Sequence, residues 1–217
     1  MVLLTFPNDI KSDFNGYDYF ISIINIVEDI EDSEVIFDFN NVSFFEANLA
    51  ALLGTCLEML MFKRNTFKII NLNRNVETIL RKNNFLVELG YGTIIDNYST
   101  SLKYMKFDPN DDEGFNDYIK QQLLSKTDFP AISPQLYKEI LRNIFEIYEN
   151  ARTHGKCDFI HTCGQFFPRK PNKPLHFTLV DKGVNIKQNV SDFLKRDISA
   201  SDAIEWAMIR RVTLGST

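Results

Sequence analysis

The feature that most limits the fold of this chain is a pair of short apolar runs that alternate with helical patterns near its beginning. The runs at residues 34–39 (EVIFDF) and 67–72 (FKIINL) are rich in β-branched and aromatic residues, which is typical of buried strands. Apolar residues recur at helical spacing in residues 14–31, 46–62 and 74–86. Because strands and helices alternate at short spacing, we expect an α/β layer over about residues 1–92.

A connector of mixed character follows at residues 93–129. It contains a possible strand at residues 101–107 (SLKYMKF) and a helical pattern at residues 114–126. Between them lies the acidic stretch DPNDDEG, which lacks the ligand spacing of an EF-hand loop. We therefore interpret this stretch as a solvated turn.

The pattern changes again after residue 130. Ser133 followed by Pro134 predicts the start of a long helix that runs to Gly155. Two alternating apolar segments, residues 157–167 and 175–181, flank a turn rich in proline and lysine, which predicts an antiparallel hairpin. A last helix is expected at residues 201–211, so the predicted fold class is α/β (α+β).

Composition excludes several classes of function and site. The chain has 217 residues, a formal net charge of −5 and a pI of about 5.3, which does not favour nucleic acid or an anionic membrane as partner. The cysteines, three in number, form no CxxC pair, so we expect a reducing, cytoplasmic compartment. No signal peptide or membrane span is predicted. Cys157, His161, Cys163 and His176 do not have a usual zinc spacing, and two alternating strands explain them better.

Four residues of the second half suggest nucleotide chemistry. Glu146 and Asn150 are four residues apart on the long helix and therefore lie on one face. The Asn oxygen is a suitable ligand for a hydrated magnesium ion, and the Glu carboxylate can orient or deprotonate water. Asp181 ends an apolar strand and can accept a hydrogen bond from an adenine amino group. Gly183 would allow the backbone to approach the base closely.

These residues carry a resemblance to a known family. The stretch EIYENARTHG resembles the N-box of the GHKL (histidine kinase-like) ATPases, and DKGVNI resembles their G1 box. The resemblance covers about residues 130–217 and implies a two-layer α/β sandwich that binds ATP and magnesium. It assigns catalytic work to Glu146 as general base and magnesium binding to Asn150. Asp181 would hold adenine and Gly183 would be the first G1 glycine, while Thr217 resembles the end of the family's lid segment at the nucleotide.

The sequence also departs from the GHKL pattern. Asn185 stands where the second G1 glycine is usual, and the glycine-rich G2 box that holds the phosphates is absent. We therefore expect a GHKL domain that is incomplete at its C-terminus.

The first half resembles a second family. The stretch EVIFDFNNVSFFEANLAALLG is similar to STAS domains, the fold of the anti-sigma-factor antagonists. Ala47 stands about where that family often has a phosphorylatable serine, so the usual phosphorylation switch is not expected. The predicted organisation is a STAS-like domain at 1–92, a connector at 93–129 and a GHKL-like domain at 130–217.

Two functions from different classes follow. The first is an ATP-binding signalling protein with a regulatory protein partner, for which the resemblance to GHKL proteins implies ATPase or protein serine kinase activity. The second is a non-enzymatic interaction or dimerisation module with a degenerate nucleotide site, in which a homodimer is expected. A histidine kinase core is a weaker third reading, since no histidine precedes Glu146.

Overall fold

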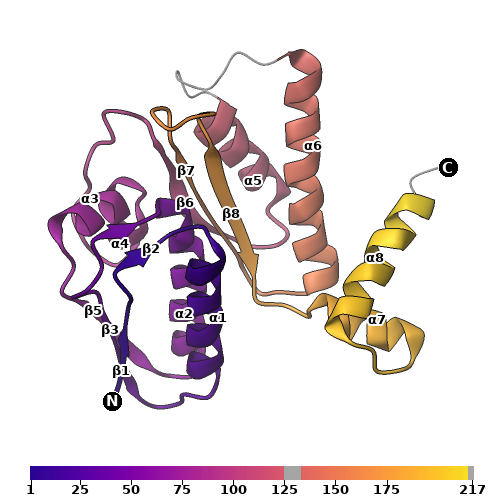
Figure 1. The fold of residues 1–217 in the computed structure, drawn as a ribbon, viewed down its shortest axis with the longest axis horizontal. Helices are drawn as coiled ribbons and strands as arrows, with labels where there is room; N and C mark the ends of the chain where they lie inside the picture. Colours follow the sequence, from indigo (N-terminus) through magenta and orange to yellow (C-terminus); the bar gives the residue numbers. More distant parts are fainter. Residues whose placement is uncertain (125–132, 215–217) are drawn as a thin grey trace.

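The computed structural model describes residues 1–124 and 133–214, and it shows a mixed α/β fold (Figure 1). A parallel sheet near the N-terminus and an antiparallel sheet from the second half lie on either side of one buried helix, α2 (Ala50–Phe62). The expectation of a general α+β class is therefore confirmed.

The N-terminal sheet consists of parallel strands in the order β1-β3-β5 within the described chain. These are β1 (Val2–Thr5), β3 (Glu34–Asp38) and β5 (Thr66–Ile70). A short parallel pair, β2 (Asp9–Ile10) and β4 (Phe44–Phe45), lies beyond them. Strands β3 and β5 fall where the apolar runs predict them. The sequence analysis missed β1, because four residues before a proline are too few to show a periodic pattern.

Helices cover this sheet at the predicted places. They are α1 (Phe14–Glu28), the 3₁₀ turn η1 (Ala47–Leu49) that leads into α2, α3 (Arg74–Lys82) and α4 (Phe85–Glu88). The pattern at residues 74–86, in which Asn83 and Asn84 predict the helix end, forms α3 and then the separate short helix α4. Asn84 adopts a left-handed conformation (φ 68°) and separates the two helices. The buried Asn83 side chain accepts the N–H of Phe85 and so starts the second helix.

The antiparallel sheet has the order β6-β7-β8 in the part of the chain that the structure describes. Its strands are β6 (Ser101–Phe107), β7 (Ile160–Phe166) and β8 (Leu175–Asp181). The predicted hairpin is confirmed, with Cys163 opposite Thr178. The possible strand at residues 101–107 is also confirmed, and it pairs with β7.

Helices α5 (Asp112–Ile119) and α6 (Pro134–Asn150) cover one face of this sheet, each continued by a π-helical turn. These turns are η2 (Lys120–Leu124) and η3 (Ala151–Gly155). The end of the helix predicted at 114–126 lies outside the described residues. Ser133 accepts the N–H of Leu136, as the N-cap prediction requires. Beneath α6, Phe115 stacks on the buried Tyr148 with ring centroids 4.0 Å apart.

Helices α7 (Ile186–Leu194) and α8 (Ala200–Leu214) form an arm beside the lower end of α6 (Figure 1). The last helix was predicted, but α7 was not. The Asn185 side chain accepts the N–H of Gln188 and caps α7. Helix α8 packs chiefly on α7, where the rings of Phe193 and Trp206 are 5.3 Å apart.

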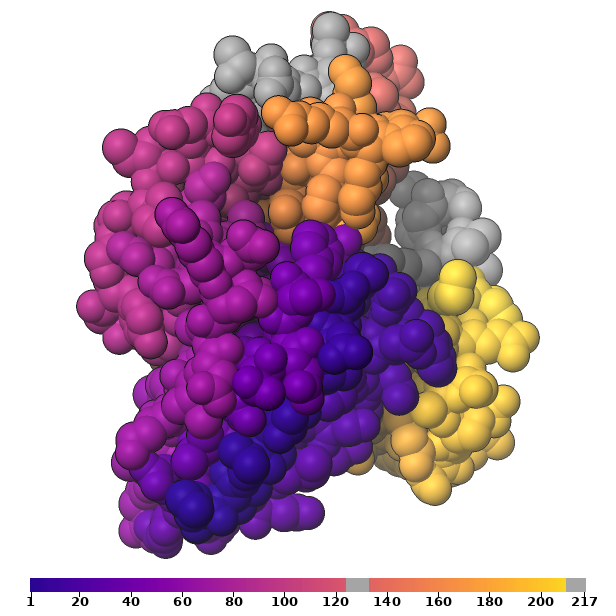
Figure 2. Space-filling model, turned by 60° about the vertical axis from the view of Figure 1, so that its left-hand side comes forward, coloured from indigo at the N-terminus to yellow at the C-terminus, as the bar shows by residue number. Residues whose placement is uncertain are grey.

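One of the two buried clusters in the described residues joins the two halves, and the other lies between the antiparallel sheet and helices α5 and α6. Cys163 of β7 and Tyr104 of β6 belong to the same buried cluster as Phe37 of β3 and Leu53 of α2. Figure 2 shows the N-terminal segments in direct contact with the orange β7–β8 region. The antiparallel sheet is therefore held between the N-terminal layer on one face and α5 and α6 on the other.

Candidate functional site

The structure brings Asp181 and Gly183 against the end of the long helix, at Gly155. The Val184 N–H donates to the Gly155 carbonyl over 2.5 Å. A Cβ atom at position 183 would lie 1.9 Å from the Gly155 carbonyl oxygen, and one at position 155 would lie 2.8 Å from Asp181 Oδ1. Position 183 therefore requires glycine, whereas a Cβ at position 155 would displace the Asp181 side chain, and the turn after β8 is held against the helix end.

The Asp181 carboxyl group lies at this junction. Its Oδ1 accepts the Gly183 N–H over 3.2 Å, and a carboxylate has capacity for further donors. Desolvation raises the pKa of this carboxyl, and backbone hydrogen bonds offset part of the rise. Because side chains alternate along a strand, Asp181 lies on the same face of β8 as Phe177 and Leu179, which pack toward α6.

Asn150 and then Glu146 lie on α6 at increasing distance from this junction. At 1.5 Å per residue, Asn150 is about 7 Å and Glu146 about 13 Å along the helix from Gly155. Glu146 is exposed and Asn150 half-buried, while Tyr148 between them faces the core. Thr217, the remaining predicted site residue, lies outside the described residues.

The chemistry of these groups fits ATP and magnesium to a limited extent. Magnesium in nucleotide sites uses one or two protein oxygens and keeps phosphates and waters as its other ligands, so one Asn oxygen is sufficient. Across residues 1–124 and 133–214, no three His, Cys, Asp or Glu side chains gather to hold a metal. A metal held at Asn150 would therefore depend on the nucleotide's phosphates.

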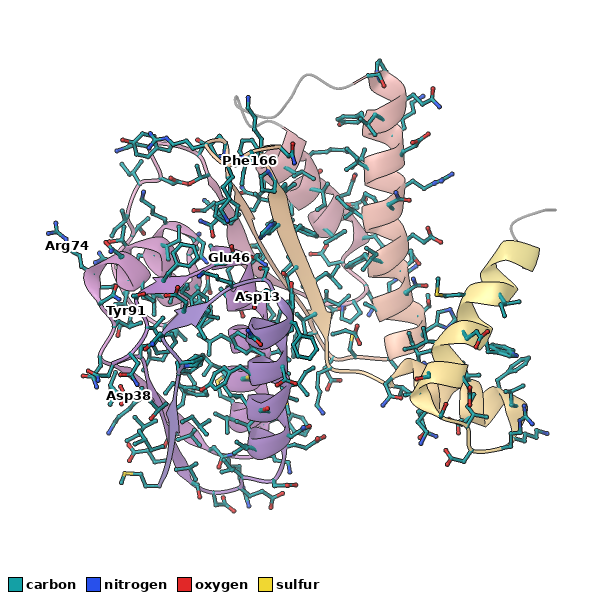
Figure 3. All side chains as sticks on the ribbon, in the orientation of Figure 1. Asp13, Asp38, Glu46, Arg74, Tyr91 and Phe166 are labelled. Atoms are coloured by element: carbon teal, nitrogen blue, oxygen red, sulfur yellow. The ribbon has the colours of Figure 1, made fainter. Side chains whose placement is uncertain are left out.

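A second polar cluster, which the sequence analysis did not foresee, surrounds Glu46. This carboxylate is 3% exposed and lies near the start of α1, at Asp13 (Figure 3). It accepts the Ser12 N–H over 2.9 Å and lies 2.9 Å from His176 Nδ1 and 3.4 Å from Lys170 Nζ. Burial alone raises the pKa of Glu46, but the hydrogen bonds from Ser12 and His176 outweigh it, so the net pKa is lowered.

The same cluster fixes the loop before α2 to the hairpin. Asn48 Nδ2 donates to Thr178 Oγ1 over 2.9 Å, and Gln165 Oε1 accepts the Ala47 N–H over 2.7 Å. Glu46 and Asn48 are charged and polar residues at the start of a largely apolar helical run, and this sequence signal pointed here. The burial of Glu46 against β7 and β8 comes from tertiary packing, which the helical pattern does not report.

A cavity of about 280 Å³ lies between α1, α6 and β8. It is lined by Tyr17, Ile144, Ile147, Phe177, Thr178 and Leu179. Apart from the hydroxyl groups of Tyr17 and Thr178, its side chains are apolar.

Comparisons with protein-family models, curated proteins and solved structures found no match to this chain. In the described ranges, no helix has the length and apolar character that crossing a membrane requires. The site is therefore interpreted from its own geometry.

Proposed function

We propose that this chain is a regulatory protein that binds ATP with magnesium at the C-terminal end of α6. The observation that carries the proposal is the turn after β8, in which Gly183 packs on the Gly155 backbone beside the exposed Asp181 carboxyl. A carboxylate acceptor next to Cβ-free backbone suits a flat base with an exocyclic amino group. This proposal follows the resemblance to GHKL ATPases.

Each residue has a distinct role in this proposal. Asp181 accepts a hydrogen bond from the base, and Gly183 leaves space for it. Asn150 offers its side-chain oxygen to the metal, and Glu146 orients water one turn further along α6. The bound metal would neutralise phosphate charge. The STAS-like N-terminal half would read the nucleotide state, or a partner's state, through the hydrogen bonds between the loop at Ala47 and the hairpin.

Titration calorimetry of the full chain with ATP and magnesium tests this proposal. Asp181→Asn should weaken binding about 10- to 100-fold, because a charge-assisted hydrogen bond contributes about 1.5–3 kcal/mol. Glu146→Ala should leave the affinity unchanged and slow any hydrolysis. Asp117→Asn is the matched control, since Asp117 is an exposed aspartate of a different element, α5. An unmodified chain that gives no binding heat would contradict the proposal.

A second candidate is a non-enzymatic interaction or dimerisation module. The observation that favours it is the apolar surface of the α7–α8 arm, where Ile186, Ile204 and Met208 are between 48% and 67% exposed. Ile204 and Met208 are four residues apart and so lie on one face of α8, and an exposed apolar face of this kind favours an interaction surface. Light scattering over a range of concentrations should then show a dimer, and Met208→Glu should return it to a monomer. A strictly monomeric chain that hydrolyses ATP would exclude this candidate.

A further inference from the structure

Strand β8 is the outer strand of the antiparallel sheet in the described chain, since it pairs with β7 and with no other described strand. The Phe167 N–H donates to the Pro174 carbonyl across the hairpin. Antiparallel pairs alternate, so the backbone groups of residues 176, 178 and 180 also point toward β7. The Thr178 carbonyl accepts a hydrogen bond from the Thr162 hydroxyl of β7, which agrees with this direction.

The backbone groups of the alternate residues, Leu175, Phe177 and Leu179, therefore point away from β7. No hydrogen bond from any described residue reaches the N–H or C=O groups of Phe177 and Leu179 on that edge. Backbone donors and acceptors next to apolar side chains need partners, and a free strand edge is the usual template for another strand.

The cavity of about 280 Å³ lies along this edge. Ile144 and Ile147 of α6 form one wall, and Tyr17 of α1 forms the other. The side chains of Phe177 and Leu179 pack toward α6, whereas Thr178 faces Asn48 on the opposite side of the sheet. The two helices thus flank opposite faces of the sheet at its open edge, and β8 lies between them in Figure 1.

This geometry selects the kind of ligand. A second copy of the chain would bring its own α1 and α6 to the same edge, where α1 and α6 already stand. A single extended strand needs only the space beside β8 and the apolar walls. The exposed Lys173 lies at the hairpin end of the edge, so a ligand with an acidic residue at that end is favoured.

We propose that the β8 edge binds an extended peptide segment of a partner protein, which adds a strand to the sheet. Hydrogen bonds to the backbone of Phe177 and Leu179 hold the segment, and its apolar side chains at alternate positions contact Ile144 and Ile147. This inference is independent of nucleotide binding at Asp181. The peptide would lie in the groove formed by the β8 edge and the cavity beside Phe177 and Leu179, which precede Asp181 on the strand.

Amide hydrogen exchange of the full chain tests the edge. In the free protein the Phe177 and Leu179 amides should exchange fast, and the Thr178 and Val180 amides slowly. The probe is an acetylated and amidated heptapeptide of alternating valine and threonine, at saturating concentration. It should protect the Phe177 and Leu179 amides. The same peptide N-methylated at alternate residues should not protect them, because it lacks the N–H donors.

A matched pair of variants tests the groove wall. Ile147→Glu places a charge in the groove from a residue that is 55% exposed, so folding should be retained. It should weaken peptide binding at least about tenfold, which is about 1.4 kcal/mol. Leu136→Glu, on the same helix and 45% exposed but outside the groove, should have no effect.

Three results would overturn the proposal. The first is slow exchange of Phe177 and Leu179 in the free monomer. The second is equal protection by the N-methylated peptide. The third is protection that appears with protein concentration alone, which would assign the edge to a second copy. Binding of ATP is expected to be the same in Ile147→Glu and the unmodified chain, so failure here is separable from failure of the nucleotide site.

Discussion

His161 in β7 is a buried imidazole that the proposed nucleotide site does not use. It is 2% exposed, and its Nδ1 lies 2.9 Å from the Tyr104 hydroxyl oxygen. Desolvation lowers the pKa of His161 from 6.5 to about 4, so the folded protein keeps the ring neutral. The sequence placed His161 on a strand but could not show which face is buried.

Stability should therefore fall as the pH is lowered below 6.5. Between pH 6.5 and 4 the unfolded chain binds a proton at His161 that the folded chain does not, so the free energy of unfolding rises with pH. From pH 7.5 to 5 the loss should be about 2 kcal/mol. Urea unfolding at the two pH values measures it. His161→Gln should remove this part of the loss, and His154→Gln, at an exposed site, should retain it.

Gly183 gives a second prediction at the scale of single residues. Gly183→Ala should lower the free energy of unfolding by about 1–3 kcal/mol, because the new Cβ meets the Gly155 backbone and forces the turn to shift. Urea denaturation measures the change. Gly92→Ala is the control, since a Cβ there meets only the flexible end of Arg81 at 3.3 Å. Equal stability of the two variants would show that the turn is not held against the helix end as described.

At the scale of elements, α6 starts where the sequence predicted. Ser133→Ala should destabilise the protein by about 1 kcal/mol, because it removes the side-chain acceptor for the Leu136 N–H. Thermal and urea unfolding are suitable measurements. Ser22→Ala, in the middle of α1, removes a hydroxyl that bonds only to the Asp18 carbonyl and should change stability by less than about 0.5 kcal/mol. If Ser133→Ala left the free energy of unfolding unchanged, the Ser133 side chain would not stabilise the start of α6.

Apolar periodicity did not predict the separate helices α4 and α7, and their starts have a physical reason in common. Helix α7 begins at Asn185, which the comparison with a glycine-containing motif presented as a departure rather than as a cap. The break at Asn84 depends on a left-handed conformation that the buried Asn83 side chain supports through tertiary contacts. Caps and turns of this kind are decided by short-range geometry that apolar periodicity does not report.

At the scale of the whole molecule, the hairpin is joined to the N-terminal layer by buried polar contacts as well as by the shared core. Gln165→Ala should cost about 1–3 kcal/mol, because it leaves the buried Ala47 N–H without its acceptor. In this variant, the backbone amides of Phe37 in β3 and Cys163 in β7 should lose hydrogen-exchange protection equally, since both residues belong to one cluster. Loss confined to β7 would mean that the halves unfold separately. Gln188→Ala, on the exposed face of α7, is the control.

The sequence by itself determined the strands β3 and β5, the hairpin, the long helix and the Asp181–Gly183 turn, because local periodicity, proline and glycine govern these features. Tertiary structure alone decided that Gly155 meets Gly183, that Glu46 is buried against His176, and that no other described strand pairs with the edge of β8 between α1 and α6. Each of these joins residues far apart in the chain. Their positions depend on how the layers pack, and spacing along one segment carries no record of that packing.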